Sequence, residues 1–184
     1  TEFTFTPGRG GRESHLRWDI GSAGSSTLLA SALLPVLAFW PMHVSVELQG
    51  GLFQDFAPSF YHFRYALLPV LKAMGLEAQV EMVRPGYVPR GGGVLRMAVT
   101  PVASALRPVV VGNDHPRTIG KIWGIALASH LAASNVSGRM ADAATQVLVE
   151  VGYGARIEVR DEETAFQPGA ALALFADLEG GARI

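Results

Sequence analysis

A six-residue sequence occurs twice in this chain and constrains its fold more than any other feature. Ala-Leu-Leu-Pro-Val-Leu stands at residues 32–37 and again at 66–71, a displacement of 34 residues. That interval is typical of tetratricopeptide repeats, but stretches with strand periodicity lie between the copies, and two copies cannot stack as a helical solenoid. We therefore expect two helices, each kinked at its proline, packed side by side on one face of a sheet.

Residue periodicity predicts strands on both sides of these helices. Val44, Val46 and Leu48 alternate with Ser45, Glu47 and Gln49, as in a half-buried strand. From about His15 to Thr100 the order strand, helix, strand, helix, strand, strand predicts a βαβαββ unit. The expected helices cover 25–39 and 59–74, and the expected later strands cover 44–49, 76–83 and 94–100.

Residues 20–46 contain no Asp, Glu, Lys or Arg, so a membrane-spanning helix is an alternative for this segment. Pro35, Pro41 and four serines oppose it, and neither flank is basic. We favour a buried helix that ends at Pro41, and predict no membrane partner.

The pattern of predicted strands and helices changes after Pro101, and we place a domain boundary between 101 and 108. Strands are expected at 109–111, 119–127, 155–160 and 170–176, with a helix from about 130 to 149 that Ser137-Gly138 interrupts. The predicted fold class is α+β. Residues 1–103 form the βαβαββ unit and residues 104–184 form a smaller, incomplete α+β domain.

Charge and composition limit the function. The chain has 15 Lys+Arg, 16 Asp+Glu and no cysteine. These numbers exclude a disordered chain, disulfides, thiolate metal sites and a cysteine nucleophile, and are compatible with a cytoplasmic protein. Near-neutral charge disfavours non-specific coating of nucleic acid but permits one local anion site. The chain starts at Thr1 with strand-like alternation over residues 3–6, so we expect an internal segment of a longer protein.

Two glycine-containing loops are candidate anion sites. Residues 19–27 form a Gly/Ser turn before the first helix, where backbone N–H groups can approach an anion. The alternative is that Ser25 or Ser26 only caps the helix. In the loop 84–93, Arg84 and Arg90 flank Gly91-Gly92-Gly93 and are candidate phosphate ligands; a tight turn with solvated arginines is the alternative.

The spacing of the five histidines indicates neither a metal site nor a catalytic site. None of the five forms a metal-binding pair or follows a serine-nucleophile motif, and no pair of carboxylates stands out for acid–base work. We expect His15, His43 and His62 to be structural, and only His130, at a strand-to-helix junction, to merit a test. We predict no metal site.

Six motifs in a fixed order resemble the RNA 3'-terminal phosphate cyclase family. Their order and spacing agree from Thr1 to about Val102, and the combination is specific although no single motif is. In this sequence they are Asp19 to Ser25, Leu-Leu-Pro at 33–35, Gly-Gly at 50–51, Ala-Pro at 57–58, Leu-Pro-Val-Leu at 68–71 and the signature Gly86 to Leu95.

The resemblance implies a fold of repeated βαβαββ units with an inserted α+β domain. Cyclases of this family use ATP, with a divalent cation such as Mg²⁺, to adenylate a histidine. They then pass AMP to an RNA 3'-phosphate and close a 2',3'-cyclic phosphate. The nucleophilic histidine belongs to a C-terminal part that is outside this chain, so we expect no catalytic residue here.

The resemblance also implies binding residues and partners. Pro58 is retained where the family contacts the nucleotide, whereas Ser31 replaces a nucleotide-binding Gln; the RNA phosphate would meet Arg84, Arg90, Gly91, Gly92 and Gly93. The implied partners are ATP, an RNA 3' end and the remaining N- and C-terminal parts of the same protein. Two other hypotheses stay open: a non-catalytic, cyclase-like RNA-binding scaffold, and a structural domain of another phosphate-ester enzyme.

Overall fold

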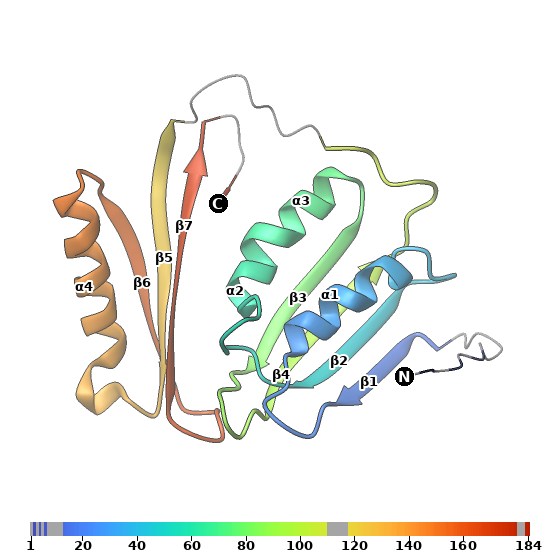
Figure 1. Ribbon diagram of the computed structural model, residues 1–184, viewed down its shortest axis with the longest axis horizontal. Helices are drawn as coiled ribbons and strands as arrows, with labels where there is room; N and C mark the ends of the chain where they lie inside the picture. The colour runs from blue at the N-terminus through green and yellow to red at the C-terminus, as the bar shows by residue number, and fades with distance from the viewer. Residues whose placement is uncertain (1, 3, 5, 7–12, 110–117, 180–182) are drawn as a thin grey trace.

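Two mixed β-sheets stand next to each other in the computed structural model, which describes residues 2, 4, 6, 13–109, 118–179 and 183–184 (Figure 1). Four strands form the first sheet: β1 (His15–Asp19), β2 (Val44–Gly50), β3 (Glu77–Arg84) and β4 (Gly93–Thr100). Three strands form the second: β5 (Ile119–Ser129), β6 (Ala155–Glu162) and β7 (Gly169–Leu178). The predicted α+β class is confirmed.

The first sheet has the order β1-β2-β4-β3, and helices lie against one of its faces (Figure 1). β1 and β2 are parallel, which requires the crossover that α1 (Ser26–Leu37) supplies. A second helical segment, which begins with α2 (Phe60–His62) and ends with α3 (Leu68–Ala73), leads into the antiparallel pair β3–β4. The predicted βαβαββ order is therefore confirmed.

The second repeat of the six-residue sequence does not form a regular α-helix throughout. Residues Phe63–Leu67 make a π-helical segment between α2 and α3. Pro69 has no N–H to donate to the carbonyl of Tyr65, four residues earlier, and its ring crowds that carbonyl. The guanidinium of Arg183 donates to the oxygen of Tyr65 instead, at 3.2 Å. A residue near the chain end thus satisfies the group that the proline leaves unbonded.

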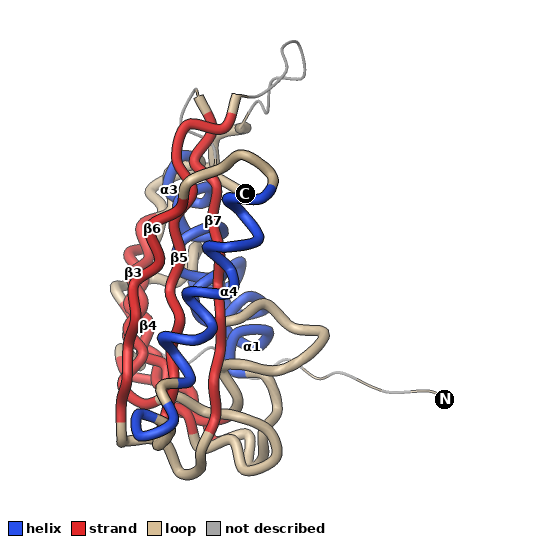
Figure 2. The backbone as a smooth tube through the Cα atoms, turned by 90° about the vertical axis from the view of Figure 1, so that its left-hand side faces the viewer, coloured by secondary structure: helices blue, strands red, loops and turns tan. Residues whose placement is uncertain are grey.

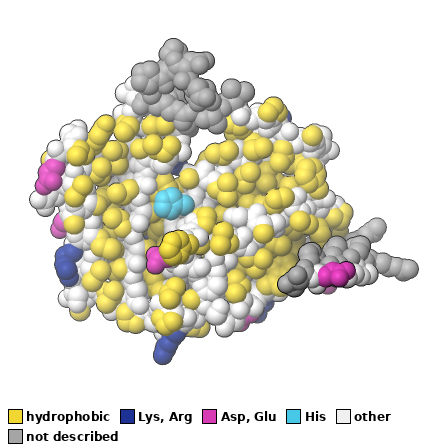
Figure 3. Space-filling model, viewed as in Figure 1, with side chains coloured by type: hydrophobic (Ala, Val, Ile, Leu, Met, Phe, Trp, Pro, Cys, Tyr) yellow, Lys and Arg dark blue, Asp and Glu magenta, His cyan; other side chains and the backbone are white. Residues whose placement is uncertain are grey.

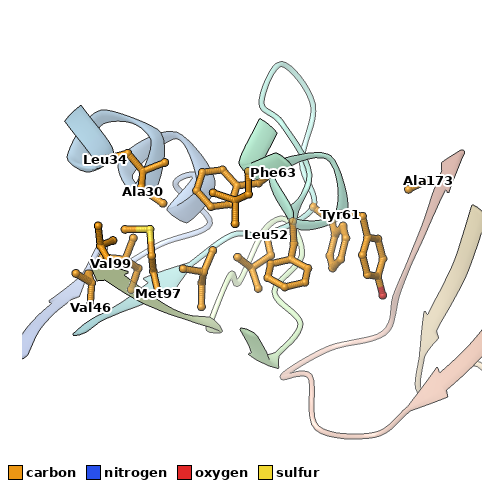
Figure 4. Packing of buried hydrophobic residues seen from close by; sticks show 14 of the residues in the cluster. Ala30, Leu34, Val46, Leu52, Tyr61, Phe63, Met97, Val99 and Ala173 are labelled. Carbon is orange, nitrogen blue, oxygen red and sulfur yellow. The ribbon is translucent and has the colours of Figure 1, made fainter. Parts of the chain in front are cut away.

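Strand alternation and helix spacing build the core between sheet and helices. Val46 on β2 and Met97 and Val99 on β4 point toward Ala30 and Leu34 on α1 (Figure 4). All five side chains are at most 3% exposed. Full burial of a side chain of this size stabilises the folded state by about 1.5–3 kcal/mol, which fixes the face of the sheet that the helices cover.

The second sheet has the order β6-β5-β7 and packs against α4 (Val136–Glu150). The expected interruption of this helix at Ser137-Gly138 is wrong, because both residues lie inside α4. The chain bends instead at Asn135, whose φ of 46° is left-handed, after a short 3-10 helix (Ala132–Ser134). A Cβ on Gly138 would collide with the Asn135 side chain, so this glycine makes room for the bend.

Aromatic side chains connect the two sheets in one continuous core. Trp123 and Phe175 from the second sheet have ring centroids 4.7 Å apart, and Tyr65 lies 5.1 Å from Trp123. On the side of the first sheet, Tyr61 contacts both Tyr65 and Phe53. The two sheets therefore share buried apolar area.

Two expected strands fall partly beyond the part of the chain that the structure describes. They are the strand at 109–111, of which 110 and 111 are outside, and the alternation over 3–6, of which 3 and 5 are outside. Among the helices in the described ranges, none has the length and apolar character needed to span a membrane.

Candidate functional site

Ser31 and Pro58, the two predicted nucleotide-binding residues, meet at Thr27. The Ser31 hydroxyl donates to the Thr27 carbonyl at 2.8 Å, and the Thr27 hydroxyl donates to the Pro58 carbonyl at 2.5 Å. Thr27 is 1% exposed, whereas Pro58 is exposed and Ser31 is half-buried. The first turns of α1 and the loop before α2 therefore place both residues at one edge of the helical layer.

The Gly/Ser turn before α1 uses its polar groups internally. Asp19 Oδ1 accepts from the Gly21 N–H at 2.7 Å, and Ser22 Oγ accepts from the Gly24 N–H at 3.1 Å. Ser25 is the N-cap of α1, and its hydroxyl accepts from the Leu28 N–H at 3.1 Å. The capping alternative for Ser25 is confirmed, and the N–H groups of Gly21 and Gly24 are already bonded.

Both arginines of the loop 84–93 contact residues of this protein. Arg84 Nε donates to the Gly92 carbonyl at 2.7 Å, and its guanidinium lies 3.9 Å from the ring centroid of Phe166. Arg90 Nη1 donates to the Phe166 carbonyl at 3.1 Å, and the Arg90 N–H donates to Gln167 at 3.2 Å. The loop is therefore attached to the connection between β6 and β7.

The three glycines of this loop allow close packing. Gly91 and Gly92 have φ of 64° and 68°, in the left-handed region that favours glycine. A Cβ would collide with Ser22 at Gly91, with the Phe166 ring at Gly92, and with Gly86 at Gly93. Binding of an RNA phosphate by Arg84, Arg90, Gly91, Gly92 and Gly93 stays a prediction.

A polar network that is buried only at Tyr87 and Ser129 lies at the junction of the sheets, and the sequence does not predict it. The Tyr87 hydroxyl and the Ser129 hydroxyl are 2.8 Å apart, and Ser129 also donates to Glu162. Glu162 accepts in turn from the N–H and the hydroxyl of Thr164, at 2.8 and 2.6 Å. Tyr87, Ser129 and Glu162 are far apart in sequence and match no spacing motif. The nearest signal in the sequence is His130, which follows Ser129 at the strand-to-helix junction.

Titration of Tyr87 should make the protein less stable at high pH. Burial raises the pKa of Tyr87 to about 12 from its usual 10. A pKa that is higher in the folded state contributes stability that is present below pH 10 and is lost as pH rises toward 12. We expect a loss of roughly 2 kcal/mol in the free energy of unfolding over this interval. Urea unfolding from pH 9 to 12 measures it.

The variant Tyr87→Phe isolates this effect, because it removes the hydroxyl and keeps the ring. The difference in unfolding free energy between wild type and Tyr87→Phe should shrink between pH 10 and 12. The control Tyr153→Phe alters an exposed ring outside the network, and its difference from wild type should not follow that course. A pH-independent difference for Tyr87→Phe would contradict the burial argument.

His130 connects β5 to the same β6–β7 connection. Its Nδ1 lies 2.5 Å from a Glu163 carboxylate oxygen, and its Nε2 lies 2.7 Å from the Ala165 carbonyl. The Ala165 carbonyl, and after it Glu163, raise the pKa of His130 above its usual value. His130, the one histidine that the sequence indicates as a candidate, therefore holds the connection between β6 and β7 in place.

His62, the last residue of α2, contacts Ser59 and Phe175. Its Nδ1 is 2.8 Å from the Ser59 hydroxyl, and its ring centroid is 5.4 Å from that of Phe175. The expected packing of His62 against aromatic residues is confirmed, although the side chain is exposed. Within the described ranges, no group of three or more His, Asp or Glu residues is arranged to hold a metal ion.

Comparison with known proteins points to one family. The family model described as RNA 3'-terminal phosphate cyclase matches residues 1–173. A protein of that name from Staphylothermus marinus is 30% identical over 187 residues, covering 100% of this chain and 52% of the relative. The one from Archaeoglobus fulgidus is 32% identical over 187 residues, covering 100% and 53%. The chain spans about half the length of the curated relatives it matches.

Proposed function

Because the chain belongs to the RNA 3'-terminal phosphate cyclase family, we propose that it is part of an ATP-dependent enzyme that converts an RNA 3'-phosphate to a 2',3'-cyclic phosphate. The family match over residues 1–173 carries this proposal. Bound ATP would supply the adenylyl group that activates the RNA phosphate. The resemblance assigns the nucleophilic histidine to a part outside this chain. The residues of this chain would therefore bind ATP and the RNA 3'-phosphate and position them for the reaction.

The surroundings of Thr27 fit an adenine nucleotide. The exposed ring of Pro58 offers an apolar surface for a base, and the Ser31 hydroxyl, which donates to Thr27, can still accept a hydrogen bond. Pro35 has no N–H, so it cannot bond the Ser31 carbonyl four residues earlier. Polar groups of Ser31 and the apolar ring of Pro58, linked through Thr27, give the mixture typical of small-molecule sites.

A divalent cation would bind chiefly through the nucleotide. Mg²⁺ keeps several waters and takes one or two carboxylates together with substrate phosphates. In the part of the chain that the structure describes, acidic side chains form no dedicated metal cluster. The phosphates of ATP would therefore provide most of the ligands.

For the RNA 3'-phosphate we propose the loop of Arg84 and Arg90. Their contacts to Gly92 and Phe166 use Nε of Arg84 and Nη1 of Arg90. Each guanidinium has further N–H groups that can donate to phosphate oxygens. These contacts hold the side chains in place, which lowers the entropy lost on binding.

The remaining parts of the enzyme would cover the helical layer. Hydrophobic side chains gather over much of that side in Figure 3, and Val36, Phe39 and Val70 are 56%, 61% and 45% exposed. Grouped exposed apolar residues mark interaction surfaces. Relatives are about twice as long as this chain, so we propose that their additional length includes segments that pack here.

The replacement of Gln by Ser31 favours a second candidate, a non-catalytic member that binds RNA. Full-length protein incubated with radiolabelled ATP distinguishes the two. A covalent AMP adduct supports the enzyme, whereas its absence, under conditions where an active cyclase forms one, supports the RNA-binding scaffold. In the scaffold, Arg84→Ala with Arg90→Ala should weaken RNA binding and reduce its salt dependence.

Restoring the family's side chain should strengthen nucleotide binding. We expect Ser31→Gln to bind ATP about three- to tenfold more tightly than wild type, the gain of one neutral hydrogen bond. Isothermal titration with ATP measures it, and Ser31→Ala is the control for loss of the hydroxyl alone. Equal affinity of Ser31→Gln and Ser31→Ala would argue against a nucleotide beside residue 31.

A further inference from the structure

A row of charged side chains crosses the four-stranded sheet on the face opposite the helices, here called the open face. The strand register pairs Arg17 with Glu47, Glu47 with Arg96 and Arg96 with Glu81. The signs therefore alternate from β1 through β2 and β4 to β3: positive, negative, positive, negative. The turned view of Figure 2 places β3 and β4 along one side of the molecule and α1 toward the other.

Glu47 holds the two arginines in position without covering them. Its oxygens lie 2.9 Å from Nε of Arg96 and 3.4 Å from Nε of Arg17. The arginine side chains remain 57% and 71% exposed, whereas the Glu47 side chain is 26% exposed. Both guanidinium groups thus keep exposed N–H groups that can donate to a partner outside the sheet.

The open face is hollowed around this row. A cavity of about 560 Å³ includes the row and the neighbouring register line of His15, Ser45, Ala98 and Gln79. Two arginines and two glutamates give the row a formal charge of zero. A nucleic-acid backbone would gain no net attraction here, because its binding depends on an excess of positive charge.

We propose that the open face binds the open face of a second copy of this chain. When one copy is turned by 180° about an axis parallel to the strands, β1 lies opposite β3 and β2 lies opposite β4. Arg17 then lies opposite Glu81 of the partner subunit, and Glu47 opposite Arg96 of the partner subunit. Symmetry repeats both pairs, so every charge of the row meets its opposite, as a two-fold interface requires.

The neighbouring line is compatible with the same arrangement. His15 lies opposite the partner's Gln79, and Ser45 lies opposite the partner's Ala98. The long side chains of each copy would enter the hollow on the open face of the other copy, a fit that two flat sheets could not make. Together with the four alternating charges, this makes the open face complementary to itself.

The size of the face sets the expected strength. Four strands about 4.8 Å apart and five residues of about 3.3 Å each give a face of roughly 20 by 17 Å. Roughly 340 Å² from each copy is less than half of the about 800 Å² per partner that a standard specific complex buries, so the interface is a weak one in which charge pairs contribute orientation and specificity more than affinity. The dimer should therefore form only at roughly a hundred micromolar, and it should weaken further as salt screens the pairs.

A charge-swap experiment tests the proposal. Sedimentation velocity of the 184-residue chain at 50 mM salt should show a dimer that dissociates at least tenfold more readily at 500 mM salt. Arg17→Glu places like charges opposite each other twice, so this variant should be monomeric, and so should Glu81→Arg. An equimolar mixture should form a heterodimer, because the changed Arg17 and Glu81 positions again carry opposite charges.

Controls separate this result from misfolding. Circular dichroism checks that each variant keeps its fold, and restored association in the mixture itself requires folded partners. Arg139→Glu changes an exposed charge on α4 and should dimerise like wild type. A wild type that stays monomeric at low salt, single variants that still dimerise, or a mixture that does not associate would each overturn the proposal. None of these readouts involves ATP or RNA.

Discussion

Replacing Gly91 by alanine is expected to lower the free energy of unfolding by about 2–5 kcal/mol. The φ of 64° at Gly91 costs a residue with a Cβ about 1–2 kcal/mol. That Cβ would also collide with the Ser22 carbonyl and lie 2.8 Å from the Ala23 Cα. These are backbone atoms that cannot rotate away, and forced overpacking costs about 1–3 kcal/mol more. Urea unfolding followed by circular dichroism measures the loss.

Gly152 provides the matched control. Its φ is 87°, so Gly152→Ala carries a similar backbone cost, but nothing lies within 4 Å of the added Cβ. We expect Gly152→Ala to cost about 1–2 kcal/mol. The difference between the two variants therefore measures the collision alone. Equal losses would show that the loop of Gly91 moves away from the turn at Ser22 without cost.

The contact between Gly91 and Ser22 also shows which information the local sequence does not contain, namely that the two loops pack on each other. The sequence indicates residues 19–27 and 84–93 as two separate candidate anion loops, each with a structural alternative. In the structure the second loop packs on the first, and Arg84 and Arg90 extend from it to the β6–β7 connection. Local composition indicates where a turn occurs, but it does not indicate which distant backbone requires the missing Cβ.

Local patterns predicted the elements of the βαβαββ unit. The alternation from Val44 to Gln49 is a property of a short segment, and β2 follows it. The uncharged apolar run before Pro41 predicts the first helix, and α1 occupies it. Within the π-helical segment Phe63–Leu67, the Tyr65 carbonyl accepts a hydrogen bond from Arg183, which lies far along the chain. Such compensation is tertiary and leaves no local pattern.

The same distinction applies to α4 and to the candidate nucleotide residues. Ser137-Gly138 has the composition of a helix break, yet Gly138 accommodates the side chain of Asn135, where the bend occurs. Ser31 and Pro58 were singled out by family resemblance, and no spacing rule connects them. Their link through Thr27 consists of two hydrogen bonds that only the packing of α1 against the loop before α2 creates.

The aromatic cluster determines how strongly the two sheets depend on each other. Phe175 on β7 is 1% exposed, and its ring centroid lies 4.7 Å from that of Trp123 and 5.7 Å from that of Tyr65. Tyr65 belongs to the π-helical segment over the first sheet, whereas Trp123 belongs to β5. Removing the Phe175 ring would therefore remove contacts within the second sheet and between the sheets at once.

We expect Phe175→Ala to lower the free energy of unfolding by about 3–5 kcal/mol, the usual cost of truncating a buried phenylalanine. Hydrogen exchange should show faster exchange in β7 and in the helical segment around Tyr65 together, because the ring supports both. Phe166→Ala is the control, since this ring is 50% exposed and its contact with the Arg84 guanidinium is worth about 1 kcal/mol. If Phe175→Ala cost no more than Phe166→Ala, or if only β7 exchanged faster, the two sheets would be joined by contacts other than this aromatic cluster.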